Sequence, residues 1–143
     1  MPLRRAVVLI AAIPVVLAPG FCLAGPARWN PRAWADESTV QLRTTATGEA
    51  EHWFKVWLVV LDDQLYVRLG SRAAGRLEKN TTGPVIGVRI AGQEFDRVRA
   101  VPAPESAERV NQAIANKYWS DVFVRWMSHP MTARLVPEPD AAK

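Results

Sequence analysis

The sequence is poor in the residues on which many metal and catalytic sites depend. Its 143 residues include one cysteine, Cys22, and two histidines, His52 and His129. Neither histidine has a second ligand at metal-binding spacing, so we predict no metal site and read both as surface or loop residues. The sequence also lacks a nucleophile elbow and the glycine-rich strand–helix turn that binds dinucleotides. No catalytic residue can therefore be named from the sequence.

Length and charge exclude further classes of protein. The chain is long enough for one domain and, with 49% hydrophobic residues, for a core that needs no metal or disulfide. Its formal net charge is only +4. Because the basic residues are not gathered in runs, we expect no nucleic-acid partner.

Residues 1–24 have the pattern of a cleavable export signal. Arg4 and Arg5 precede an almost unbroken apolar run from Ala6 to Ala18, and small residues near Ala24 place the cut after it. The run is shorter than the roughly 20 residues of a spanning helix. We therefore expect an exported protein, periplasmic or secreted, whose mature chain has no membrane span and has lost Cys22. The arginine pair also fits a twin-arginine signal, and an uncleaved anchor is the alternative.

The clearest structural element is a hairpin. Its strands are Trp53 to Leu61 and Gln64 to Leu69, and Asp62-Asp63 forms the two-residue turn between them. One face of this hairpin is wholly aliphatic and must be core, with Val60 opposite Leu65, Leu58 opposite Val67 and Val56 opposite Leu69.

The rest of the sequence predicts a small antiparallel barrel. Residues 25–37 lack periodicity and are read as an extended arm, and 138–143 as a polar tail, on either side of a domain at 38–137. The remaining elements follow in the order Ser38–Thr45 (strand), Gly70–Asn80 (loop with a short helical turn), Val85–Ile90 and Gln93–Val101 (hairpin), Pro104–Trp119 (long helix), Ser120–Met127 (shorter helix) and Met131–Val136 (strand). So many hairpins indicate a mainly β fold, a closed or partly open barrel with helical cover.

Groups suited to a phosphate and a planar ring gather at one end of the first hairpin. On the second face of this hairpin, Val59 is expected opposite Tyr66 and Trp57 opposite Arg68. Basic and hydroxyl-bearing residues follow directly after the second strand. Guanidinium groups, a hydroxyl and backbone N–H groups bind phosphate oxygens, while Trp57 and Tyr66 offer a wall for a ring. The candidate cofactor-binding residues are Lys55, Trp57, Arg68, Ser71, Arg72 and Arg76. An ordinary basic loop rim, with Trp57 filling space beside a helix, is the other interpretation.

The same stretch resembles a known family. Leu65 to Arg72, followed by Leu77 to Asn80, is similar to the FMN-binding split-barrel superfamily of pyridoxamine phosphate oxidase-like proteins. In those proteins a strand ends in a turn with Ser-Arg or Ser-Lys, and a Leu-x-x-Asn segment leads into the next strand. Lys117-Tyr118 at the end of the long helix, and a last strand ending at Pro137, also resemble small single-domain members of unassigned function.

The resemblance implies an antiparallel split β-barrel of about six strands with one long and one short helix near the C-terminus. It also implies a homodimer with two cofactor sites at the subunit interface. In each site Ser71 and Arg72 would hold the phosphate, with Lys55 and Arg68 close by and Trp57 near the ring. Such relatives bind FMN, a deazaflavin or haem, and the lack of a strong axial ligand favours FMN. The chain departs from the pattern after Asn80, where Thr81 stands in place of proline.

We therefore expect an exported flavin-binding protein that acts as an oxidoreductase on an unidentified substrate. The alternative is a non-catalytic binding module that has lost its cofactor and binds a partner through a tryptophan-rich surface. The tryptophans in question are Trp29, Trp34, Trp119 and Trp126. A small apolar ligand or lipid in the barrel mouth is a third interpretation.

Overall fold

The computed structural model of the chain describes residues 27–118 and 131–139. The predicted export signal lies outside the described residues, as do Trp119, Trp126, His129 and the shorter helix predicted at Ser120–Met127. No helix in the described part of the chain is long and apolar enough to cross a membrane.

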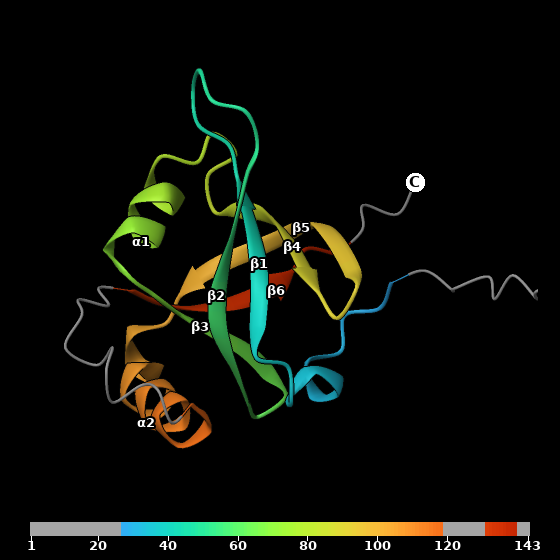
Figure 1. Ribbon diagram of the computed structural model, residues 1–143, viewed down its shortest axis with the longest axis vertical. Coiled ribbons are helices and arrows are strands. Elements are labelled where there is room, and N and C mark those ends of the chain that lie inside the picture. Colours follow the sequence, from blue (N-terminus) through green and yellow to red (C-terminus); the bar gives the residue numbers. More distant parts are fainter. Residues whose placement is uncertain (1–26, 119–130, 140–143) are drawn as a thin grey trace, which may run out of the picture.

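Six antiparallel strands form a closed barrel in the order β1-β2-β3-β6-β5-β4 (Figure 1). The strands are β1 (Thr39–Thr44), β2 (His52–Leu61), β3 (Gln64–Leu69), β4 (Val85–Ile90), β5 (Gln93–Pro102) and β6 (Met131–Pro137). The predicted mainly β, antiparallel fold is thus confirmed, and each predicted strand is present within one or two residues of its expected bounds.

The first hairpin turns where expected, but its strands separate sooner than the sequence predicts. Asp62 and Asp63 have φ of 51° and 58°, the left-handed values that a two-residue turn of this hand requires. The predicted register holds from Leu61 opposite Gln64 to Leu58 opposite Val67. The expected pairs Trp57–Arg68 and Val56–Leu69 are wrong, because β2 continues along β1 while β3 continues along β6. The two strands therefore diverge like the arms of a fork.

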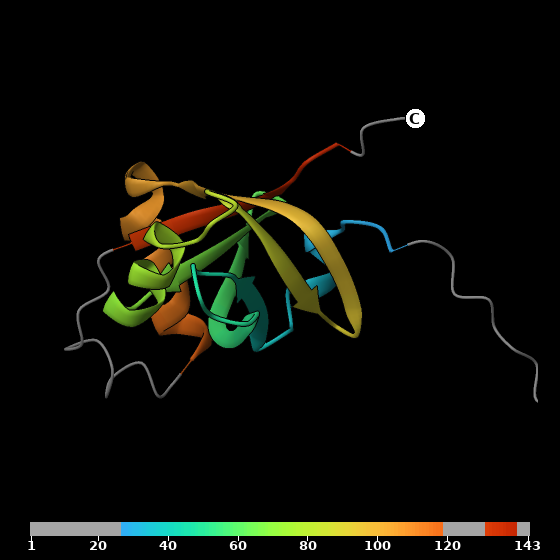
Figure 2. The same ribbon diagram turned by 90° about the horizontal axis from the view of Figure 1, so that it is seen from above.

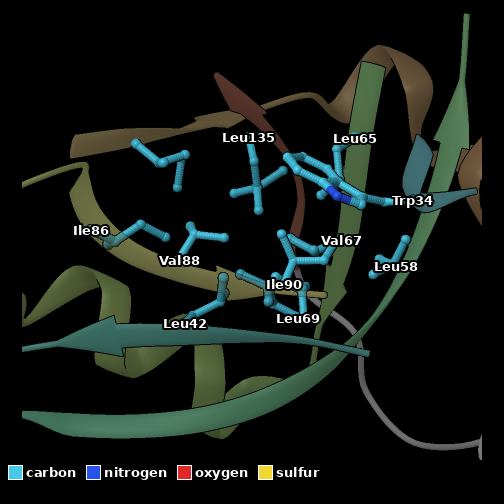
Figure 3. Close-up of a cluster of buried hydrophobic side chains, with 14 of the residues drawn as sticks. Trp34, Leu42, Leu58, Leu65, Val67, Leu69, Ile86, Val88, Ile90 and Leu135 are labelled. Atoms are coloured by element: carbon cyan, nitrogen blue, oxygen red, sulfur yellow. The ribbon is translucent and has the colours of Figure 1, made fainter. Parts of the chain in front are cut away.

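The aliphatic face of this hairpin is core, as predicted. Leu58, Leu65 and Val67 are fully buried inside the barrel together with side chains from all the other strands. Figure 3 shows the ring of Trp34 among these aliphatic side chains, toward one end of the cluster. The barrel interior is thus filled by protein side chains.

The predicted extended arm is not extended throughout. Pro31 begins a short 3-10 helix, η1 (Pro31–Trp34), whose last residue is only 2% exposed. The ring of Trp34 meets Trp29 and Phe95 edge to face, with ring centroids 5.1 Å and 5.7 Å away. The turn forms because proline suits a first helical position and a tryptophan three residues later gains by burial.

Two helices cover the opposite side of the barrel from η1 (Figures 1 and 2). The short helical turn predicted within the loop Gly70–Asn80 is longer than expected, a two-turn helix, α1 (Ser71–Glu78), that takes up most of the segment. The long helix is present as a 3-10 turn at Pro104–Ser106 (η2) followed by α2 (Ala107–Lys117), with Val110 and Ile114 fully buried. These two residues cover Val59 and Tyr66 on the outer face of the first hairpin.

Candidate cofactor-binding pocket

A pocket of about 500 Å³ lies where β2 and β3 diverge. We call it the fork pocket, and it is lined by Thr39, His52, Phe54, Lys55, Val56, Trp57, Arg68, Gly70, Arg72, Ala73 and Arg76. Its volume is within the range of about 300–1,000 Å³ typical of small-molecule and cofactor sites.

The divergence of the strands explains how these residues come together. From His52 to Trp57 strand β2 is paired with β1, and its register with β3 begins only at Leu58. Successive residues on this stretch of β2 therefore line the pocket rather than alternating strictly between core and solvent. Across the gap, β3 supplies Arg68, and Gly70 leads directly into α1.

The pocket is strongly cationic. Its lining includes Lys55, Arg68, Arg72 and Arg76, and among its described lining residues there is no carboxylate. Arg72 and Arg76 lie one helical turn apart on α1 and so share a face. Arg68 is only 9% exposed, and its Nη1 donates to Asn111 Oδ1 on α2 at 3.5 Å. Four cationic side chains in one lining suit an anionic ligand.

Trp57 forms an aromatic wall that is held from behind by the end of α2. Its ring is parallel to that of Tyr118, with an interplanar angle of 3° and centroids 4.6 Å apart. The Tyr118 hydroxyl lies 2.7 Å from the carbonyl oxygens of both Ser38 and Leu58 and accepts the Leu58 N–H at 3.3 Å. One face of Trp57 is thus occupied by protein, and the remainder of the ring borders the pocket.

The end of α2 is also tied to the barrel by Lys117. Its Nζ donates to the carbonyl oxygens of Glu37 at 2.6 Å and Leu58 at 3.3 Å. Burial lowers the pKa of the Lys117 ammonium group and raises the pKa of the Tyr118 phenol. Both shifts have the same cause, the poor solvation of charge at this junction.

Most of the predicted site residues meet in the fork pocket. Lys55, Trp57, Arg68, Arg72 and Arg76 all line it. The sixth, Ser71, instead lines a neighbouring hollow of about 350 Å³ beside α1, together with Thr44, Ala46, Glu49, Arg72, Gly75, Arg76 and Lys79. We call this second hollow the α1 pocket.

Two residues lie where the sequence did not predict them. Tyr66, expected as a second wall for a ring, is 8% exposed and packed under α2 with Val110 and Ile114. His52 is exposed, as expected of a surface residue, but it is the first residue of β2, lines the fork pocket and stacks on Phe54 at 6.1 Å, which was not predicted. The only sequence signal for His52 was its position next to the predicted strand, which gives no indication of a pocket.

Within the described ranges, 27–118 and 131–139, no group of three or more His, Cys, Asp or Glu side chains has the geometry to hold a metal ion. The fork pocket thus offers cations and aromatic rings rather than a set of metal ligands.

Neither the scan against protein-family models nor the search of curated proteins finds a match to this chain. Two solved structures resemble it. The crystal structure of the conserved hypothetical protein Rv2991 from Mycobacterium tuberculosis has 17% identity and a TM-score of 0.53, covering 75% of this chain and 78% of that one. The crystal structure of HutZ, the heme storage protein from Vibrio cholerae, has 18% identity and a TM-score of 0.54, covering 75% of this chain and 87% of that one. Both are split-barrel proteins, so the likeness supports a split-barrel fold for this chain.

Proposed function

We propose that the fork pocket binds a flavin cofactor of the FMN type and that the protein is an oxidoreductase. One observation carries the proposal. A pocket of about 500 Å³ combines an apolar and aromatic wall with four cations and, among its described lining residues, no acid. An aromatic ring system that bears a phosphate has matching chemistry at both ends.

The residues present fit such a ligand. Phe54, Val56 and Trp57 supply an apolar surface for the ring system, and Arg72 and Arg76 supply guanidinium groups for the phosphate. The N-terminus of α1 has no side-chain cap at Gly70, so its first N–H groups also favour an anion. Bound flavin would supply the redox chemistry, while the chain binds, orients and desolvates it. We assign no catalytic residue.

FMN titration of variants tests the proposal. Arg72→Ala removes an exposed guanidinium and is expected to weaken FMN binding by about tenfold or more, the usual effect of losing a charge-assisted hydrogen bond. Adding Arg68→Ala should weaken it further. Flavin fluorescence measures the affinity, and circular dichroism checks that each variant is folded.

Arg89→Ala is the matched control, because Arg89 pairs with Glu94 on the β4–β5 hairpin and does not line the pocket. Unchanged FMN affinity in the Arg68/Arg72 double variant would show that the site assignment is wrong. If the wild-type protein does not bind FMN, that result would favour the alternative function, a non-catalytic binding module.

Haem is a second candidate for the same pocket. His52 lines it beside Phe54, histidine is a common axial ligand of haem iron, and the cations suit carboxylates such as haem propionates. One of the structurally similar proteins, HutZ, is a heme storage protein. Hemin titration distinguishes the two, because a His52→Ala change should abolish a histidine-ligated Soret band but leave FMN binding nearly unchanged.

We further propose that the mature protein is exported and dimeric. The export proposal is supported by the pattern of residues 1–24, and the homodimer by the family resemblance. N-terminal sequencing of the periplasmic or secreted form should begin at Gly25, and sedimentation equilibrium should give twice the mass of one chain.

A further inference from the structure

The fork pocket and the α1 pocket meet at two shared residues. Arg72 and Arg76 line both of them. A ligand whose ring lies against Trp57 and whose phosphate reaches these arginines would therefore end at the entrance to the α1 pocket. Whatever lies beyond the first phosphate would enter that second pocket.

Among its described lining residues, the α1 pocket has one carboxylate, Glu49, which contacts one of the shared arginines. Glu49 Oε2 lies 3.5 Å from Arg76 Nη1. The remaining charged residues of the lining, Arg72, Arg76 and Lys79, are all cations. Apart from Glu49, the α1 pocket therefore has the chemistry to attract a second phosphate group.

The position of Glu49 is fixed by a tight turn in the β1–β2 loop. The Glu49 N–H donates to the Ala46 carbonyl oxygen at 3.0 Å. Gly48, between them, has φ of +80°, the left-handed value that a type II turn requires at its third position. The turn thus fixes the backbone at Glu49, and the contact with Arg76 places its carboxylate beside α1.

We infer that Glu49 is a specificity residue that limits the site to ligands with a single phosphate and selects against diphosphate-linked ones. The inference rests on the proposed function. A second phosphate beyond Arg76 would lie beside the Glu49 carboxylate or have to displace it from Arg76, and like charges at such distances repel. A monophosphate that stops at Arg72 and Arg76 avoids this repulsion.

The test compares FMN with FAD, which share the ring system and the first phosphate but differ in the second phosphate and the adenosine. The measured quantity is the ratio of Kd for FAD to Kd for FMN, determined at low salt so that charge is not screened. In Glu49→Gln this ratio should fall by about threefold to fivefold relative to wild type, the size of one partly exposed charge interaction. The adenosine contribution is the same in both proteins and cancels from the comparison.

Glu51→Gln is the matched control. Glu51 is on the same loop and has the same side-chain exposure as Glu49, 58%, but it pairs with Arg43 and does not line the α1 pocket. Its FAD-to-FMN ratio should equal that of wild type. An unchanged ratio in Glu49→Gln, with FMN still bound, would overturn the specificity role and leave the proposed function intact. Failure of the wild type to bind either flavin would overturn both.

Discussion

Asn80 joins two segments of chain through one buried side chain. It is 7% exposed, its Nδ2 donates to the carbonyl oxygens of Gly83 at 2.6 Å and Val85 at 3.0 Å, and its Oδ1 accepts the Thr45 N–H at 3.0 Å. The amide therefore links the start of the β1–β2 loop to the turn that leads into β4. Without the Asn80 amide, these part-buried backbone groups would lose three hydrogen bonds at once.

Asn80→Ala is accordingly expected to lower the free energy of unfolding by about 2–3 kcal/mol. Urea denaturation measures the change. Thr81→Ala is the comparison, because Thr81 makes an exposed hydroxyl contact with Thr45 at 2.7 Å and should cost about 1 kcal/mol or less. Equal losses in the two variants would contradict the role given to the buried amide.

The candidate site shows which residue positions the sequence could predict. Strand alternation was enough to group Lys55 with Trp57, because side chains two residues apart share a face. Arg68 was added through an expected pairing with Trp57 that the structure does not have, and it lines the pocket from across the gap between the strands. Alternation was not enough for His52, whose place in the fork pocket depends on where β2 leaves β3. That separation is decided by the outer partners of the hairpin, the preceding strand β1 and the strand β6, which is far away in sequence.

At the scale of elements, Tyr118 attaches the end of α2 to the barrel. Its hydroxyl contacts Ser38 and Leu58, and its ring supports Trp57. Tyr118→Phe keeps the stacked ring and removes the hydroxyl, so it should cost about 1 kcal/mol of stability at neutral pH and leave FMN affinity nearly unchanged. Tyr118→Ala removes the ring as well, and we expect weaker FMN binding. Urea denaturation and FMN titration give the two quantities.

The pH dependence of the phenylalanine variant provides an independent check. Burial raises the pKa of Tyr118 above its ordinary 10.0, so the folded state holds the phenol proton more tightly than the unfolded state. The hydroxyl's contribution is therefore complete below pH 10 and declines as the unfolded chain ionises above it. The stability gap between wild type and Tyr118→Phe should shrink above pH 10, and a gap that widened there would be inconsistent with the assigned cause.

Helix α1 is the element that the sequence predicted least well. Gly75 lies in its middle and costs about 1 kcal/mol relative to alanine, whereas the alanine, arginine, leucine and glutamate residues around it are good helix formers, so local propensity alone does not decide the helix. It is stabilised by packing instead, since Ala74 is 7% exposed and Ala73 and Leu77 contact the barrel core. Strong local patterns fixed the strands, whereas this helix depends on contacts that only the closed barrel provides.

At the scale of the whole molecule, the arm closes one end of the barrel. Trp34 is 2% exposed and lies in the same cluster as Val40 and Leu65. Trp34→Ala should therefore lower the free energy of unfolding by about 3–5 kcal/mol, as for other large-to-small changes in a core. Chemical denaturation of the variant measures this.

Trp53→Ala is the control for that prediction. Its ring lies on the outside of the barrel, with the Arg43 and Arg89 guanidinium carbons 5.4 Å and 4.2 Å from its centroid. Loss of these cation–π contacts should cost about 1 kcal/mol. If Trp34→Ala and Trp53→Ala lowered the free energy of unfolding equally, the burial of Trp34 would not be what closes the barrel core.

The overall architecture was accessible from the sequence because its hairpins are local. Two hairpins, an opening strand, a helical stretch and a final strand are present in the predicted order. The role of the arm was not accessible, because residues 27–34 have no periodic pattern and Trp34 is buried by strands that follow it in the chain.

The position of β6 also determines when the barrel can form. This strand, made from residues 131–137, is inserted between β3 and β5 and pairs with both. A nascent or truncated chain that ends before it would leave two hydrogen-bonding edges open, and such edges recruit other chains. The barrel can therefore close only once residues 131–137 are available to pair with both edges.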